Sequence, residues 1–135
     1  MDAILILDTS ILIDLEHGKI HRDAFPNVEL KIAAISVAEY RTGIELNSDT
    51  RRARSMEQTL SAILEVCTVL DYTERTAEHH ARLLAECRRS GRIRGNHDLI
   101  IAAHAAETGD TILSRDAAAR FSGLTGVRAA SPADL

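Results

Sequence analysis

The chain contains no tryptophan, and aromatic residues make up only 3% of its 135 residues. Hydrophobic residues nevertheless reach 45%, which excludes a disordered chain of low hydrophobicity. The core must therefore be built from Ile, Leu, Val and Ala. Because stacking of nucleic-acid bases needs aromatic side chains, stacking can contribute little to any recognition of RNA or DNA.

Long apolar runs are also missing, since no segment approaches the roughly 20 residues of a membrane span. The N-terminus has no basic segment followed by a long apolar one, so we expect no secretory signal. Cys67 and Cys87 lie far apart and form no CxxC pair, which favours a reduced, cytoplasmic protein. The length predicts a single domain over residues 1–135.

Lysine is scarce: only Lys19 and Lys31 occur, and the net charge is −4. This balance argues against a simple binder of polyanions. Arginines gather in two groups, namely Arg51, Arg52 and Arg54, then Arg88, Arg89, Arg92 and Arg94. Each group is either a solvated helix face or a site that binds phosphate or carboxylate groups.

Several motifs of well-known enzymes are absent from the sequence. There is no G-x-S-x-G elbow, Walker loop, G-x-G-x-x-G turn, HExxH motif or Cys/His zinc spacing. His97 and His104 are seven residues apart and could share a helix face. No acidic pair precedes Asp8, and no second Asp follows two residues later, which disfavours a receiver domain and a phosphoaspartate phosphatase.

Short aliphatic segments alternate with segments of helical periodicity. Strands are predicted at Ile4–Leu7, Ile32–Ile35, Val66–Leu70, Thr111–Leu113 and Val127–Ala129. Helices are predicted at Ser10–Glu16, Ile20–Phe25, Ser36–Leu46, Thr50–Leu64, Thr73–Arg89, Leu99–Glu107 and Ala117–Phe121. This alternation predicts an α/β domain with a central parallel sheet of four to five strands, flanked by helices. Such sheets bind ligands at the carboxyl ends of their strands.

Four acids are predicted to meet at that edge: Asp8, Glu39, Asp98 and Asp116. Asp8 directly follows the first strand, and Asp116 follows the fourth. A cluster of carboxylates repels itself, and a divalent cation removes the conflict. Mg²⁺ or Mn²⁺ prefers such oxygen ligands, so the pattern indicates a metal site suited to phosphodiester chemistry.

Each acid also has a purely structural interpretation. Asp8 could cap the next helix, and Glu39 completes an S-x-x-E capping box with Ser36. Asp98 is favoured near any helix N-terminus, and Asp116 could be a turn or N-cap residue. The common placement of the four acids is what favours a site.

Two further acids are expected to lie outside the site. Asp14 is predicted to be a surface acid that faces solvent or an arginine. Asp71 ends the third strand and is the chief competitor for a place in the site, although its context resembles a turn.

Four segments in this order are similar to motifs of one family: Leu7–Ser10, Ile35–Gly43, Asp98–Ala105 and Ile112–Asp116. The chain resembles the PIN-domain family over essentially its whole length, most closely the VapC-type toxins of bacterial toxin–antitoxin modules. The resemblance implies a Mg²⁺- or Mn²⁺-dependent ribonuclease that acts on single-stranded or loop RNA. It also implies a homodimer that is neutralised by a VapB-type antitoxin.

The resemblance assigns the metal-binding and catalytic set to Asp8, Glu39, Asp98 and Asp116, with Ser10 and Ser114 as supporting hydroxyls. Where relatives often carry a polar or acidic residue before a Phe, this chain has Ala117–Arg120, so Asp116 is expected to be the weakest ligand. Candidates for contacts with substrate phosphates are Arg92, Arg94 and Arg115. The alternative is a PIN-like module that binds RNA or an antitoxin without cleaving.

Overall fold

The computed structural model describes residues 3–25 and 27–134 of the chain. Its five strands are β1 (Ala3–Leu7), β2 (Val28–Ala33), β3 (Cys67–Leu70), β4 (Thr111–Leu113) and β5 (Arg128–Ala130). Its helices are α1 (Thr9–Glu16), α2 (Ala34–Leu46), α3 (Thr50–Val66), α4 (Glu74–Ser90), α5 (Asn96–Thr108) and α6 (Ala117–Phe121), with short 3-10 turns η1 (Arg22–Ala24) and η2 (Pro132–Asp134).

The strands form one parallel sheet in the order β3-β2-β1-β4-β5. The chain first builds outward from β1 to β3 and then returns to the other side of β1 with β4. The order therefore reverses between β1 and β4, and this is the point at which open α/β sheets bind ligands. The predicted α/β class and parallel sheet are confirmed.

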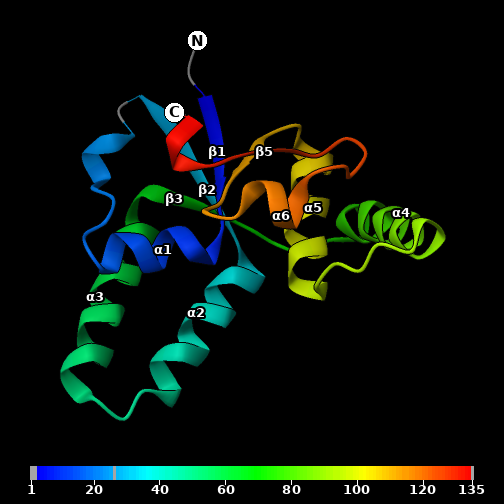
Figure 1. Ribbon diagram of the computed structural model, residues 1–135. Helices are drawn as coiled ribbons and strands as arrows, with labels where there is room; N and C mark the ends of the chain where they lie inside the picture. The colour runs from blue at the N-terminus through cyan, green and yellow to red at the C-terminus, as the bar shows by residue number, and fades with distance from the viewer. Residues whose placement is uncertain (1–2, 26, 135) are drawn as a thin grey trace.

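Helices cover both faces of the sheet, and β1 contributes to both cores. Ile6 packs into the core formed with α4 and α5, whereas Leu5 and Leu7 pack into the core formed with α1 and α3. In Figure 1, α1 and α3 lie on one side of the sheet and α4 and α5 lie on the other. Both cores are mainly aliphatic, as the scarcity of aromatic residues predicts.

The second strand begins earlier and ends earlier than the predicted Ile32–Ile35, so that prediction is wrong. It runs over Val28–Ala33, and Ala34 and Ile35 already belong to α2. The polar residues Glu29 and Lys31 interrupt its apolar run, but the alternation with Val28, Leu30 and Ile32 is the period of a strand. The predicted helix Ile20–Phe25 is reduced to the 3-10 turn η1.

Helix ends follow local chemistry. Thr73 and Thr76 form a reciprocal capping box at the start of α4. Gly91 and Gly109 end α4 and α5 with φ values of 72° and 78°, a conformation that glycine adopts without strain. Within residues 3–25 and 27–134, no helix has both the length and the apolar character needed to cross a membrane.

Candidate acidic site

Asp8 lies where β1 ends and α1 begins, in the centre of the sheet. Its side chain is almost completely buried, with 1% of the residue exposed. Its backbone amide donates to the carbonyl of Leu113 on β4 (3.0 Å), which joins the two strands at the switch point. Asp8 occupies the N-cap position of α1, but its side chain makes no capping hydrogen bond. The capping interpretation therefore does not explain this carboxylate.

Three donors instead converge on one oxygen of the Asp8 carboxylate. The hydroxyls of Ser10 and Ser114 donate to Oδ2 at 2.8 and 2.9 Å. Arg120 Nη1 donates to the same oxygen at 3.2 Å. A buried carboxylate is tolerable only with such hydrogen bonds and a counter-charge. Ser10 and Ser114 lie where the resemblance places supporting hydroxyls.

Asp98 lies in the first turn of α5, which runs back toward the start of β4. Its Oδ1 is 3.7 Å from the same Arg120 Nη1, so one guanidinium nitrogen lies between Asp8 and Asp98. Burial raises the pKa of Asp98 above its ordinary value; Asp8 and Glu39 add to the rise, while Arg120 and His97 oppose it. Because Asp8 and Glu39 contribute to this rise, the three carboxylates place negative charge close together.

Glu39 belongs to the second turn of α2, because that helix begins at Ala34. The predicted capping box with Ser36 is therefore wrong: the N-cap is Ala33, and the buried Ser36 hydroxyl has no hydrogen-bond partner. Glu39 Oε2 instead pairs with His97 Nδ1 at 2.7 Å.

The pKa of Glu39 lies below its ordinary value. Burial alone would raise it, but the Thr9 hydroxyl, His97 and Arg120 together outweigh burial. The Thr9 hydroxyl lies close enough to act on this carboxylate, yet it makes no hydrogen bond of good geometry. Thr9 is therefore a close neighbour of Glu39, and its hydroxyl has no hydrogen-bond partner among the described residues.

Asp116 is set apart from the other three acids. It is exposed at the N-cap position of α6, and its side chain makes no capping hydrogen bond. Its backbone amide donates to the Ser114 hydroxyl at 3.2 Å. Within the described ranges, no ion pair or side-chain hydrogen bond joins Asp116 to Asp8, Glu39 or Asp98.

We call the four acids Asp8, Glu39, Asp98 and Asp116 the acidic rim. The donor chemistry of this rim fits a divalent cation of the Mg²⁺ class. Asp8 and Asp98 are hard oxygen donors, and both face one cationic nitrogen of Arg120, which stands where a positive ion would be stabilised. As they lie, no three His, Cys, Asp or Glu side chains among the described residues are close enough together to hold a metal. The site thus presents a pair of carboxylates, Asp8 and Asp98, with Glu39 turned toward His97.

The three arginines proposed to contact phosphates are engaged within the protein. Arg92 donates to the Gly123 carbonyl, and Arg94 donates to the carbonyls of Ala119 in α6 and of Ser122 just after it. Arg115 Nη1 lies 2.6 Å from Asp14 Oδ1. Asp14 is 5% exposed, so the prediction of a surface acid is wrong, although its arginine partner was among the expected alternatives.

Other candidates lie away from the rim. His104 is buried in the core, which lowers its pKa, and it shares no contact with His97 among the hydrogen bonds and ion pairs of the described chain. Asp71 follows β3, which is an edge strand two positions from β1. The two cysteines are free, and burial raises the pKa of Cys67 to about 11.

Arg120 was not predicted from the sequence, and His97 was only a minor candidate. Arg120 lies four residues after Asp116 on a short helix, and nothing in its local sequence shows that its side chain reaches a residue 112 positions earlier. His97 precedes Asp98 directly, and its position in the first turn of α5 was the available signal.

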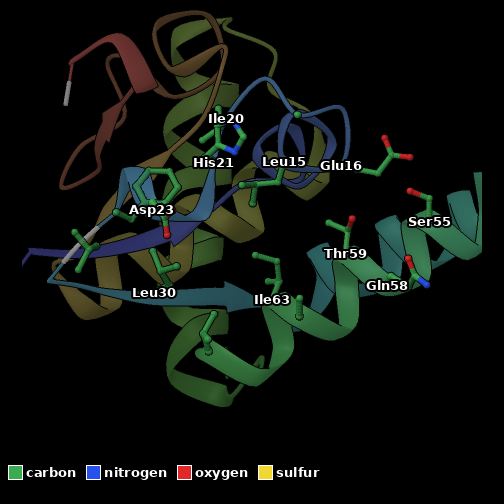
Figure 2. A pocket seen from close by; sticks show the side chains of 15 residues that line it. Leu15, Glu16, Ile20, His21, Asp23, Leu30, Ser55, Gln58, Thr59 and Ile63 are labelled. Atoms are coloured by element: carbon green, nitrogen blue, oxygen red, sulfur yellow. The ribbon is translucent and has the colours of Figure 1, made fainter.

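A hollow of about 840 Å³ lies elsewhere, between α1, β2 and α3. Figure 2 shows Leu15, Leu30 and Ile63 lining it, together with polar side chains such as Gln58. None of the four predicted acids belongs to its lining. The hollow is therefore separate from the acidic site.

Comparisons with curated proteins give relatives that carry a ribonuclease name. The chain is 33% identical over 86 residues to "Ribonuclease VapC2" of Haemophilus influenzae. The matched segment covers 63% of this chain and 62% of that relative's length. It is 27% identical over 112 residues to "Ribonuclease VapC1" of Rickettsia felis. That match covers 82% of this chain and 83% of the relative's length.

Solved structures share the fold over nearly the whole chain. A DNA-bound VapBC from Salmonella typhimurium gives a TM-score of 0.84 at 24% identity, covering 96% of this chain and 98% of that one. VapBC-5 from Mycobacterium tuberculosis gives 0.77 at 26% identity, with the same coverage. The sequence model of the PIN domain matches residues 5–123, which include all four acids. The chain therefore belongs to the PIN domain family.

Proposed function

We propose that this chain is a metal-dependent endoribonuclease toxin of the VapC type that cleaves single-stranded or loop RNA. The observation that carries the proposal is the pair Asp8 and Asp98, which face one positive charge at the β1/β4 switch point. The ribonuclease names of relatives from two organisms support the substrate class.

In this proposal Asp8 and Asp98 hold Mg²⁺ or Mn²⁺, with Glu39 joining after it leaves His97, and Asp116 as the weakest member. When bound, such an ion activates water and offsets charge on a phosphodiester. Ser10 and Ser114 keep Oδ2 of Asp8 in one orientation, since both hydroxyls donate to it. The expected products carry 5′-phosphate and 3′-hydroxyl ends.

The direct test is Mn²⁺-dependent cleavage of RNA by wild type, Asp8→Asn and Asp98→Asn. Asp71→Asn is the matched control, because Asp71 follows another strand of the same sheet outside the acidic rim. We expect cleavage by wild type and Asp71→Asn, and its loss in the other two variants. Equal cleavage by all four proteins would exclude the acidic-site mechanism.

We also propose that a VapB-type antitoxin binds this chain and blocks the acidic rim, and that the complex contains a homodimer of the toxin in the cytoplasm. Structures named as VapBC complexes support the partner class, and the chain's net charge of −4 suits a basic segment of the partner. The test is the mass of the chain alone and with the antitoxin encoded beside it, together with RNA cleavage by both samples.

The alternative is a PIN-like module that binds RNA or an antitoxin without cleaving. Growth inhibition on expression distinguishes the two functions. Inhibition that disappears in Asp8→Asn supports catalysis, whereas inhibition that persists in a folded Asp8→Asn variant supports binding alone.

A further inference from the structure

Arg120 places a positive charge inside the acidic site itself. Its Nη1 lies 3.2 Å from Asp8 Oδ2 and 3.7 Å from Asp98 Oδ1. We propose that the Arg120 guanidinium is a resident cation of the site, which a divalent metal ion must displace. Arg120 therefore weakens metal binding and determines the apparent metal affinity of the site. This inference rests on the proposed function, because it assumes that the site takes a metal.

The position of Arg120 is fixed by its helix and by a network around α6. Arg94 donates to the carbonyls of Ala119 and Ser122, at 3.2 and 3.0 Å. Arg92 donates to the next carbonyl along, that of Gly123. The backbone of α6 is thus tied to the loop before α5, and displacement requires movement of the Arg120 side chain alone.

The hydrogen bonds to Asp8 show that Arg120 supplies charge more than orientation. Ser10 and Ser114 already donate to the same carboxylate oxygen, at shorter distances than Arg120 does. What the hydroxyls cannot supply is a positive charge for a carboxylate that is 1% exposed. The guanidinium supplies that charge as long as no other cation is present.

A metal ion and the guanidinium cannot both occupy this place. Each would be stabilised by the same two carboxylates, and like charges at such a distance repel. The Arg120 side chain is 39% exposed, so it has a route into solvent when it is displaced. Displacement therefore exchanges one counter-charge of Asp8 for another.

The test measures Mn²⁺ binding to the purified chain without antitoxin. The electron paramagnetic resonance signal of free Mn²⁺ gives the amount that is not bound. If the displaced state is populated about one tenth of the time, Arg120→Gln tightens the apparent Kd about tenfold. Arg120→Lys keeps the charge on a shorter side chain, so its apparent Kd for Mn²⁺ is expected to lie between those of wild type and Arg120→Gln. Asp8→Asn is expected to abolish the tight binding.

The matched control is Arg54→Gln, which removes the same charge from an exposed position on α3 and is expected to bind Mn²⁺ as wild type does. Equal or weaker binding by a folded Arg120→Gln variant would overturn the inference, as would equal tightening by Arg54→Gln. Absence of Mn²⁺ binding in every variant would overturn the proposed function as well. A larger Mn²⁺-induced rise in Tm for Arg120→Gln or Arg120→Lys than for wild type is the second supporting readout.

Discussion

The acidic rim has two unlike halves. The first half, Asp8 and Asp98, faces one guanidinium nitrogen, and Asp8 also accepts from two hydroxyls. The second half, Glu39 and Asp116, projects from α2 and from the start of α6, where both residues are exposed. Asp8 is buried among three donors and shares the Arg120 charge with Asp98, whereas the exposed Glu39 and Asp116 can change partners. The comparison predicts that fixed ligands are indispensable and that adjustable ones tune the site.

The largest expected effect is that of Asp8→Asn. The variant keeps an oxygen for the serine hydroxyls but removes the charge that would hold the metal. RNA cleavage should fall by about 100-fold or more, the upper end of losses seen when metal-site partners are changed. Single-turnover cleavage measures this, with circular dichroism to confirm folding. Retained activity would show that the fixed half is not the catalytic one.

Removal of one supporting hydroxyl, in Ser114→Ala, is expected to have the next largest effect. The Asp8 carboxylate would lose a hydrogen bond of 2.9 Å and with it part of its orientation. We expect Mn²⁺ affinity and cleavage to fall by about 10-fold. Titration with Mn²⁺ monitors the change. An unaltered affinity would mean that Ser10 and Arg120 orient Asp8 without help.

Asp116→Asn is expected to have a smaller effect on cleavage than either change in the fixed half. The Asp116 side chain is exposed, and in the described chain it makes no ion pair with the other acids. The loss should stay below about 10-fold, the lower end for metal-site partners. Cleavage assays run in parallel with Asp8→Asn give the ratio. An equal loss in both variants would remove the distinction between the halves.

The smallest effects concern stability and pH in the metal-free protein. Burial raises the pKa of Asp98, so this carboxyl binds its proton at a higher pH in the folded state than in the unfolded state. The free energy of unfolding therefore increases as the pH falls through the raised pKa. The pKa of Glu39 is lowered in the folded state, against the effect of burial. Glu39 therefore stabilises the fold at pH values above its unfolded-state pKa, and this stabilisation is lost as the pH falls through its folded-state pKa.

The stability of wild type should therefore rise on acidification when measured relative to Asp98→Asn, and fall when measured relative to Glu39→Gln. Each change is expected to stay below about 1 kcal/mol, because both carboxyls are partly exposed to solvent. Urea unfolding in a chelator, at pH values from neutral into the carboxyl range, measures the free energy. Slopes of the same sign would contradict the contrast between the two carboxyls.

The sheet was predictable because its signals are local. The aliphatic segments that form β1, β3 and β4 are bounded by polar residues and glycines, and parallel order follows from the helices between them. The second strand was misplaced because Glu29 and Lys31 break its apolar run at the less buried end. The two-residue alternation was present but less obvious than a continuous run.

The acidic site was predictable only as a set of candidates. Asp8 and Asp98 follow from the rule that ligands gather at the carboxyl edge of the sheet. The Ser36–Glu39 pattern indicated a capping box, but α2 begins at Ala34 because its first turn continues directly from β2. Arg120 depends on the direction of one long side chain across the site, and no local pattern encodes that direction.

The pairing of β1 with β4 also has a consequence for the order in which the molecule is made. Asp8 leaves the ribosome early, but Ser114 and Arg120, which hold its carboxylate, lie 106 and 112 positions later. A nascent chain that ends before β4 has neither the central strand's second neighbour nor the counter-charge for its buried acid. Proteins are synthesised from the N-terminus, so this rim is completed only when the last part of the chain has emerged. The incomplete polypeptide is therefore expected to lack the assembled acidic site.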